Sequence, residues 1–287
     1  IFLFSQDFTV LGGSLGEMHA ARIAEAQMLA LRNGCPFIQI NDSGGARIQE
    51  GTLSLDGYAK IFRANTVSSG VIPQFSVILG PCAGGAVYSP AITDFVLMVD
   101  GISNMYITGP DVIKAVTGEE ISHEALGGAE AHCSRSGVAH FRFPDEAECL
   151  GFLRKLLGYL PLNNTEMPPL ADTGEAVNRE TPELEELLPD DPKRPYDIRD
   201  FIAAVCDRDS FLEVHGGYAP NVVVGFARLA GRTVGLFANQ PKFYAAALDI
   251  NSSDKAARFI RFCDCFNIPI ISLVDVPGFL PGVAQEH

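Results

Sequence analysis

An internal repeat is the feature of this sequence that most constrains its fold. A constant offset of 233 positions links the first half of the chain to like residues in the second half, without a gap. The matched pairs include Leu15 with Leu248, Arg22 with Lys255, Pro36 with Pro269, Asp42 with Asp275, and Gly45 with Gly278. Because self-similarity at one fixed spacing is typical of duplicated structure, the sequence predicts two tandem copies of one unit.

Both copies predict a helix, a turn, and a buried strand that runs into a glycine-containing loop. In the second copy, Ser252 or Ser253 is the expected N-cap of the helix. The residues that follow have the i, i+3, i+4, i+7 spacing of a buried helical face: Ala256, Phe259, Ile260 and Cys263. In the first copy, Asn33-Gly34 ends the helix and Pro36 prevents its continuation. Short strands are expected at 36–41 and 269–276, which indicates an α/β fold.

The second copy contains elements for which the first copy has no residues. A helical stretch is expected at 198–206, followed by a hairpin at 222–238 whose turn is Ala230-Gly231. At the other end, the glycine-rich segment 81–86 of the first copy would correspond to positions 314–319. The expectation is a piece of a longer two-domain chain in which the second copy is truncated.

Residues 163–195 separate the two copies and are rich in proline and acidic residues. Low apolar content with clustered prolines favours an extended connector or a surface wrap. We therefore predict an N-terminal domain at 1–162, a linker at 163–195, and the start of a C-terminal domain at 196–287.

Composition excludes several classes of function. The formal net charge of −14 argues against nucleic acid as a partner, because a phosphate backbone would be repelled. The longest apolar runs, such as 71–80, are far shorter than the roughly 20 residues of a membrane span. The seven cysteines are scattered without C-x-x-C spacing, which favours buried thiols in a reducing compartment and no metal site.

Two glycine-rich loops follow buried strands in the first copy. The first is SGGAR at 43–47, where consecutive glycines let backbone N–H groups converge on an anion and Arg47 adds positive charge. The second is PCAGGA at 81–86, after a strand at 75–79. If Gly84-Gly85 opens a helix, the free N–H groups of its first turn can hold negative charge. Each loop alone also fits a tight turn or close packing, but two together favour an oxyanion-binding site.

Other catalytic arrangements lack their motifs. None of the six histidines lies in a motif that marks it as the base of a Ser-His-Asp triad, which argues against such a triad. The segment GGSLG at 12–16 lacks the spacing of a phosphate-binding loop and is interpreted as a turn before a helix. Cys263 and Cys265 are expected on different faces of their helix. The chemistry that remains is stabilisation of an oxyanion by backbone amides, without a protein nucleophile.

Several longer motifs resemble the β subunits of biotin-dependent acyl-CoA carboxylases, which are carboxyltransferases of the crotonase superfamily. The motifs are FSQDFTV at 4–10, GGSLGE at 12–17, SGGARIQEG at 43–51, SGVIPQ at 69–74, the Gly84-Gly85 loop, ITGPDVIK at 107–114, and CDCFNIPIISLVDVPGFLPG at 263–282. The resemblance covers nearly the whole chain. It implies two crotonase-like ββα superhelical domains, in agreement with the repeat.

The resemblance also implies partners and site residues. In this family the N-terminal domain binds acyl-CoA, the C-terminal domain binds biotin, and the active site forms between domains of two subunits. A hexamer of head-to-tail dimers and a partner with biotin carboxylase and biotin carrier functions are implied. Gly84 and Gly85 match the amides that hold the enolate oxygen. Acyl-CoA contacts are implied for Ser43, Gly44, Gly45, Ala46, Arg47 and Ala83. Biotin contacts are implied for Val276, Pro277, Gly278 and Phe279.

The implied reaction explains why no catalytic base is evident. In the family, the α-proton of the acyl-CoA is removed by the anion of biotin, and the enolate takes up CO₂. Propionyl-CoA or acetyl-CoA is the favoured substrate, and no metal is implied for this subunit. The implied location is the cytoplasm of a bacterium, or the mitochondrial matrix of a eukaryote.

Three alternatives stay open on the sequence. One is the carboxyltransferase subunit of a methylmalonyl-CoA decarboxylase or a transcarboxylase, which uses the same fold. Another is a biotin-independent hydratase or isomerase of the crotonase type, in which Glu50 or Glu17 would be the acid or base. The last is a non-catalytic scaffold that binds CoA.

Overall fold

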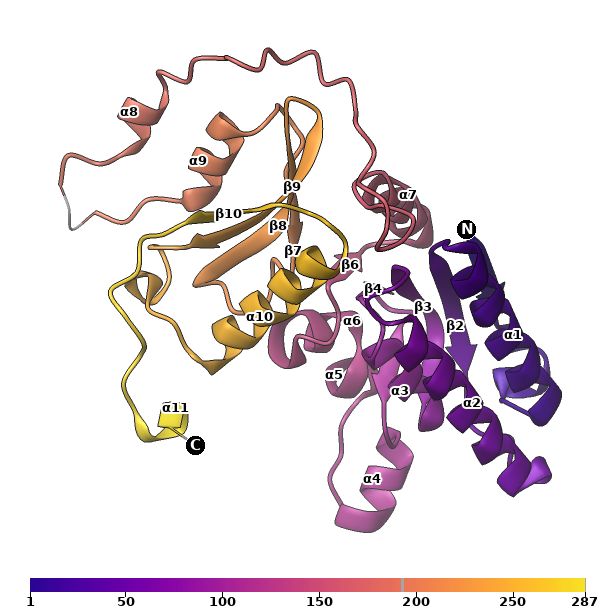
Figure 1. Ribbon diagram of the computed structural model, residues 1–287. Coiled ribbons are helices and arrows are strands. Elements are labelled where there is room, and N and C mark those ends of the chain that lie inside the picture. The colour runs from indigo at the N-terminus through magenta and orange to yellow at the C-terminus, as the bar shows by residue number, and fades with distance from the viewer. Residues whose placement is uncertain (192–193, 287) are drawn as a thin grey trace. The chain divides into compact units, whose positions relative to one another are not determined.

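The structure, a computed structural model, describes residues 1–191 and 194–286 (Figure 1). These residues form two compact units. The first comprises residues 1–154 and 162–164, and the second comprises residues 155–161 and the chain from residue 165 onward. The domain limits predicted from the sequence remain a prediction, and residues 192–193 of the predicted linker lie outside the described part.

The first unit is built on a parallel sheet. Its strand order is β1-β2-β3-β4-β6, and β5 pairs with the end of β3. The strands are β1 (Phe2–Ser5), β2 (Phe37–Ser43), β3 (Gln74–Ala83), β4 (Phe95–Val99), β5 (Asn104–Tyr106) and β6 (Phe141–Phe143). β4 is buried along its whole length, as expected for a parallel strand covered on both faces. The strands predicted at 36–41 and 75–79 are confirmed, and β3 continues to Ala83.

Helices connect these strands. The helices of the first unit are η1 (Leu11–Gly13), α1 (Glu17–Asn33), η2 (Ile48–Glu50), α2 (Thr52–Ser68), α3 (Gly85–Ala91), α4 (Pro110–Thr117), α5 (His123–Gly127), α6 (Ala129–Ala131), η3 (His132–Ser136) and α7 (Glu146–Leu157), the last of which runs into the second unit. α1 ends at Gly34, whose φ of 60° is left-handed, so the predicted end is confirmed. The turn predicted at 12–16 is also confirmed, because α1 begins directly after it.

The second unit contains a mixed sheet in the order β10-β9-β8-β7. Its strands are β7 (Leu212–Val214), β8 (Val222–Leu229), β9 (Arg232–Asn239) and β10 (Ile270–Leu273), and its helices are α8 (Leu184–Leu187), α9 (Ile198–Val205), η4 (Tyr244–Ala246), α10 (Ile250–Cys265) and α11 (Val283–Glu286). β8 and β9 form the predicted hairpin, with Ala230-Gly231 as its turn. In neither unit is any described helix long and apolar enough to cross a membrane.

The N-cap predicted for α10 is wrong. Asp249 caps the helix by accepting a hydrogen bond from the Ser252 N–H at 2.9 Å. Ser252 is the N3 residue and completes a capping box, since its hydroxyl accepts from the Asp249 N–H at 2.9 Å. The buried helical face is confirmed at Ala256, Phe259 and Cys263, whereas Ile260 is partly exposed. Cys265 is exposed on the other face, as predicted.

The internal repeat is confirmed by the registers of the two sheets. Phe2 pairs with Phe37 in parallel, and 233 positions later Gly235 pairs with Ile270 in the same way. Isolated parallel bridges join Leu15 to Ala46 and Leu248 to Phe279, again at the same offset. The short helices η1 and η4 follow the same offset. The two units therefore share a strand, helix, strand and loop in one geometry.

Candidate active site

The two glycine loops of the first unit lie directly against each other. Ser43 at the end of β2 is in register with Cys82 of β3. A Cβ atom added at Gly45 would lie 2.7 Å from the carbonyl oxygen of Ala83, closer than real Cβ contacts. Gly45 has a φ of 98°, which a side chain rarely tolerates. Glycine at this position is thus required for the loop at 43–47 to meet the turn at 83–85.

Backbone hydrogen bonds occupy most of the amides in the first loop. The Gly44 N–H donates to Gly12 O at 2.9 Å, the Gly45 N–H to Ser43 Oγ at 3.2 Å, and the Arg47 N–H to Leu15 O at 2.9 Å. Within the described part of the chain, the Ala46 N–H has no acceptor. Ala46 is half-buried, and its amide is available to a ligand.

In the second loop, the amide of Gly84 is already engaged. It is shared between Tyr106 O and Ile107 O, each at 3.2 Å, because β5 pairs with the end of β3. Gly85 is the first residue of α3, and its N–H has no acceptor among the residues that the structure describes. The sequence indicated the amides of Gly84 and Gly85. The geometry instead leaves those of Gly85 and Ala46 free.

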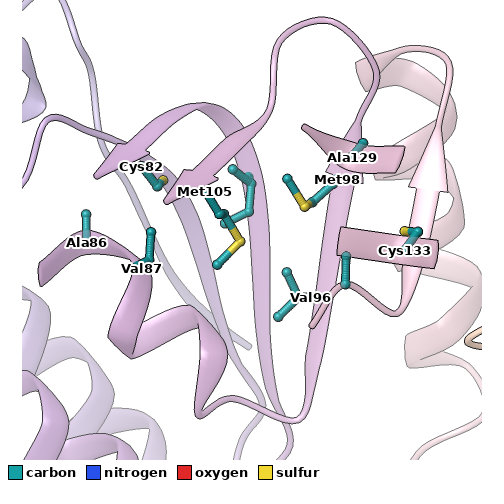
Figure 2. Packing of buried hydrophobic residues seen from close by; sticks show 10 residues of the cluster. Cys82, Ala86, Val87, Val96, Met98, Met105, Ala129 and Cys133 are labelled. Carbon is teal, nitrogen blue, oxygen red and sulfur yellow. The ribbon is translucent and has the colours of Figure 1, made fainter. Parts of the chain in front are cut away.

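A buried cluster holds the second loop in place. Figure 2 shows Cys82 before the turn and Ala86 and Val87 after it, all directed into one hydrophobic core with Met98 and Met105. On the other side, a Cβ at Gly85 would lie 2.7 Å from the ring of Tyr58. The turn is thus held from both sides, so its amides are preorganised.

No nucleophile is evident beside these amides. Burial raises the pKa of the Cys82 thiol to about 12, so it is not a thiolate at neutral pH. The Ser43 hydroxyl is fully buried and donates to Gly13 O at 2.8 Å, while it accepts from the Gly45 N–H. Both side chains are structural, and the absence of a protein nucleophile at the site remains a prediction.

Glu50 is held in an ion pair and at a helix N-terminus. One carboxylate oxygen accepts from Arg47 Nη1 at 2.8 Å, and the other accepts from the Glu17 N–H at 2.6 Å, in the first turn of α1. The hydrogen bond from Glu17 and then that from Arg47 lower the pKa of Glu50. A carboxylate with both oxygens engaged and a lowered pKa is a poor proton donor.

Glu50→Gln is therefore expected to leave the rate of catalysis within about threefold of the wild type, since a catalytic acid or base contributes about 10²–10⁴-fold. Steady-state kinetics of the variant check this, and Glu17→Gln tests the other candidate in the same way. A loss of hydration of an enoyl-CoA by more than about 100-fold in Glu50→Gln would instead support a hydratase.

A pocket of about 370 Å³ opens beside the first loop. It is lined by Ser5, Gln6, Asp7, Val10, Gly13, Met18, His19, Arg22 and Arg47. Arg47 is fixed by hydrogen bonds to Ser14 O at 2.8 Å and Ser14 Oγ at 3.2 Å. Burial lowers the pKa of His19. Arg22 and Arg47 are positively charged groups of this lining, which also contains Asp7, and Arg47 is at the same time paired with Glu50 at 2.8 Å.

The loop at 276–279 in the second unit repeats the geometry of the first loop. The Leu248 N–H donates to Gly278 O at 2.9 Å, and the Leu280 N–H donates to Leu248 O at 2.7 Å. These bonds match those of Leu15 with Gly45 and Arg47. The Phe279 N–H, like that of Ala46, has no acceptor in the described part of the second unit. The sequence repeat could have revealed this, since Ala46 and Phe279 are 233 positions apart.

Comparison with known proteins adds an independent line of evidence. The model of the carboxyl transferase domain matches residues 1–287. The chain is 60% identical to the methylmalonyl-CoA decarboxylase subunit alpha of Veillonella parvula, over its whole length and 56% of that protein. It is 58% identical to the propionyl-CoA carboxylase carboxyltransferase subunit of Haloferax mediterranei, again over its whole length and 56% of that protein.

A solved structure of transcarboxylase 12S, described as a hexamer with hydrolysed methylmalonyl-coenzyme A bound, is 54% identical and superposes with a TM-score of 0.96. It covers 99% of this chain, which covers 56% of that one. The duplicated α/β fold is thus crotonase-like, with its amide-lined loops in both copies. The chain belongs to the carboxyl transferase domain family. It spans about half the length of the curated relatives that it matches.

Proposed function

We propose that this chain transfers a carboxyl group between biotin and the α-carbon of a short acyl-CoA. The observation that carries the proposal is the pair of free amides at Ala46 and Gly85, beside which the described side chains of Cys82, Ser43 and Glu50 are all held in structural roles. Such donors stabilise the oxygen of a thioester as negative charge develops on it. The required intermediate is an enolate, because carbon–carbon bond formation at the α-carbon passes through one.

The hydrogen bond from each amide becomes stronger as negative charge grows on the thioester oxygen, and this strengthening is the source of catalysis. Removing one oxyanion donor typically costs about 10²–10³ in rate. We propose that Ala46 and Gly85 hold the enolate oxygen, while Gly84 gives the turn its left-handed φ of 55°. Ser43, Gly44, Gly45 and Ala83 shape the loops around this point. The pocket with Arg22 and Arg47 would take the phosphate groups of CoA.

The loop at 276–279 fits the ureido ring of biotin. Phe279 offers an amide donor, its side chain is 74% exposed, and an added Cβ at Gly278 would meet no atom within 4 Å. Val276 and Pro277 lie on the same stretch of chain. When bound, carboxybiotin supplies the carboxyl group and, after its release, a basic nitrogen for the α-proton. The chain's own part is to hold the ureido oxygen through the Phe279 N–H.

Propionyl-CoA and its carboxylated form, methylmalonyl-CoA, are the proposed substrate pair. One relative is named for the decarboxylation of methylmalonyl-CoA, and another for the carboxylation of propionyl-CoA. These are two directions of one exchange at one α-carbon. We propose carboxylation as the direction, and decarboxylation is the second candidate because of the 60% identity to the decarboxylase subunit.

One experiment separates the two directions. The protein is combined with a biotin carboxylase and its biotin carrier, and incorporation of ¹⁴C-bicarbonate into propionyl-CoA is measured with and without ATP. ATP-dependent labelling supports the carboxylase. Release of CO₂ from methylmalonyl-CoA with a biotin carrier and no ATP supports the decarboxylase. Binding of CoA without either reaction would contradict both and leave a scaffold role.

The partner and the assembly follow as proposals. The related transcarboxylase 12S is described as a hexamer. We propose a homo-hexamer that engages a biotin-carrying subunit, in the bacterial cytoplasm or the mitochondrial matrix.

A further inference from the structure

A buried lysine in the second unit has no part in the chemistry described so far. Lys255 lies on α10 with 2% of its side chain exposed. Its Nζ lies within hydrogen-bond distance of four backbone carbonyls, which share its N–H donors: Tyr218 O and Val222 O at 2.7 Å, His215 O at 3.0 Å, and Ala219 O at 3.3 Å. All four belong to residues 215–222, the connection from β7 to β8. Within the described part of the chain, no carboxylate forms an ion pair with Lys255.

A buried charge without an ion pair costs stability unless hydrogen bonds compensate it. Among the charged groups, Glu213 has the largest effect on the pKa of Lys255. Its carboxylate is instead bound by Arg199 through two hydrogen bonds of 2.6 and 2.7 Å. The connection at 215–222, which Lys255 contacts, is also unusual, since His215 and Ala219 have φ values of 55° and 43°. These conformations disfavour a side chain. The lysine thus holds a strained loop in place.

Asn221 in the same connection contacts the residues on either side of Leu248, and Leu248 binds the loop at 276–279. Asn221 is fully buried, and its amide donates to Ala247 O at 2.8 Å and to Asp249 Oδ1 at 3.2 Å. Those two residues flank Leu248. Leu248 in turn exchanges backbone hydrogen bonds with Gly278 and Leu280 on either side of Phe279.

We infer that Lys255 is a positioning residue for the proposed biotin loop, acting through residues 215–222, Asn221 and Leu248. The inference rests on the proposed function for the identity of the ligand. The series of hydrogen bonds that links Lys255 to the loop does not depend on it. Its counterpart in the first copy is Arg22, an exposed residue at the pocket beside the loop at 43–47. The duplicated position has thus taken a different part in each unit.

Hydrogen exchange tests the link directly. In Lys255→Met, the amides of Leu248 and Leu280 are expected to exchange at least about tenfold faster, together with residues 215–222, because buried carbonyls lose their donor. In Asn221→Ala, Leu248 and Leu280 are expected to accelerate while residues 215–219 change by less than about threefold. This second variant keeps the lysine and its four acceptors, so it tests the step from Asn221 to Leu248 by itself. If Lys255→Met does not fold, Lys255→Gln tests the lysine with the same readout.

Two controls accompany the variants. Lys60→Met removes an exposed lysine from α2 and should change neither region. The Arg47 amide, which bonds Leu15 in the equivalent position of the first unit, should keep its protection in every variant. Unchanged exchange at Leu248 and Leu280 in both Lys255→Met and Asn221→Ala would overturn the inference.

Kinetics adds the functional readout. In Lys255→Met and in Asn221→Ala, the KM for the biotin carrier is expected to rise about tenfold, while the Kd for acyl-CoA, proposed to bind the first unit, stays unchanged. A merely structural lysine would weaken both. If the wild type transfers no carboxyl group, the proposed function fails while the exchange data still decide the link. If transfer is normal in a variant whose loop exchanges faster, the positioning role fails instead.

Discussion

Gly45→Ala is expected to lower the rate of carboxyl transfer by about 10²–10³, the effect of losing one oxyanion donor. The new Cβ would lie 2.7 Å from Ala83 O, a backbone atom that cannot turn aside. The loop at 43–47 must then move away from the turn at 83–85, which separates the amides of Ala46 and Gly85. The measurement is kcat for carboxylation at saturating acyl-CoA, together with the Kd for CoA.

The matched control for this variant is Gly101→Ala. Gly101 lies in the same unit with a φ of 72°, and an added Cβ there would meet no atom within 4 Å. It therefore introduces a comparable backbone strain, roughly 1–2 kcal/mol, without a clash at the site. Equal rate losses in the two variants would mean that strain, and not separation of the amides, lowers the activity. A Gly45→Ala enzyme with normal kcat would contradict the proposed oxyanion hole.

Asp207→Ala is expected to lower the free energy of unfolding by about 3 kcal/mol or more, because it leaves buried donors without an acceptor. Asp207 is 5% exposed and accepts from the Ala230 N–H at 2.9 Å, the Gly231 N–H at 2.7 Å and Thr173 Oγ1 at 2.7 Å. Although burial raises the pKa of this carboxyl, the hydrogen bond from Gly231 and the others lower it overall. The carboxylate thus pins the hairpin turn.

Urea unfolding followed by circular dichroism checks this prediction, since the chain has no tryptophan. Asp207→Asn keeps an acceptor oxygen and should lose less than the alanine variant. Asp264→Ala, at an exposed position of α10, should change the free energy by less than about 0.5 kcal/mol. If Asp264→Ala and Asp207→Ala were equally mild, the hairpin turn would not depend on its carboxylate.

The contacts of the proline-rich acidic segment at 163–195 could not be predicted from its composition. Its composition indicated an extended connector or a surface wrap, and the described residues bind the second unit through specific contacts. Arg179 donates to Ala204 O and Cys206 O, both at 2.8 Å, at the end of α9. Arg228 is buried, donates to Pro169 O at 3.1 Å, and stacks over the ring of Tyr159 at 4.5 Å. These arginines are distant in sequence from their acceptors, so composition could not identify them.

The sequence alone determined the duplication, the ends of elements, and the loops that bear the site. Gly34, the Ala230-Gly231 turn and the glycine runs at 44–45 and 84–85 are local signals, because backbone conformation there depends on the residue itself. Residues that pair in the first sheet correspond, at the offset of 233 positions, to residues that pair in the second sheet. Asp249 as the cap of α10 was missed, since Ser252 and Ser253 offer the same local chemistry.

Only the tertiary structure decided which amides are free. The Gly84 N–H is engaged because β5 returns to pair with the end of β3, and the Ala46 N–H is free because Leu15 bonds the residues on both sides of it. The surroundings of Lys255 were also decided by the tertiary structure. The sequence pattern predicted that this residue lies on a helix, and the structure shows its Nζ among four carbonyls. A hydrogen-bond partner is set by which segments meet in space, and residues far apart in sequence decide that together.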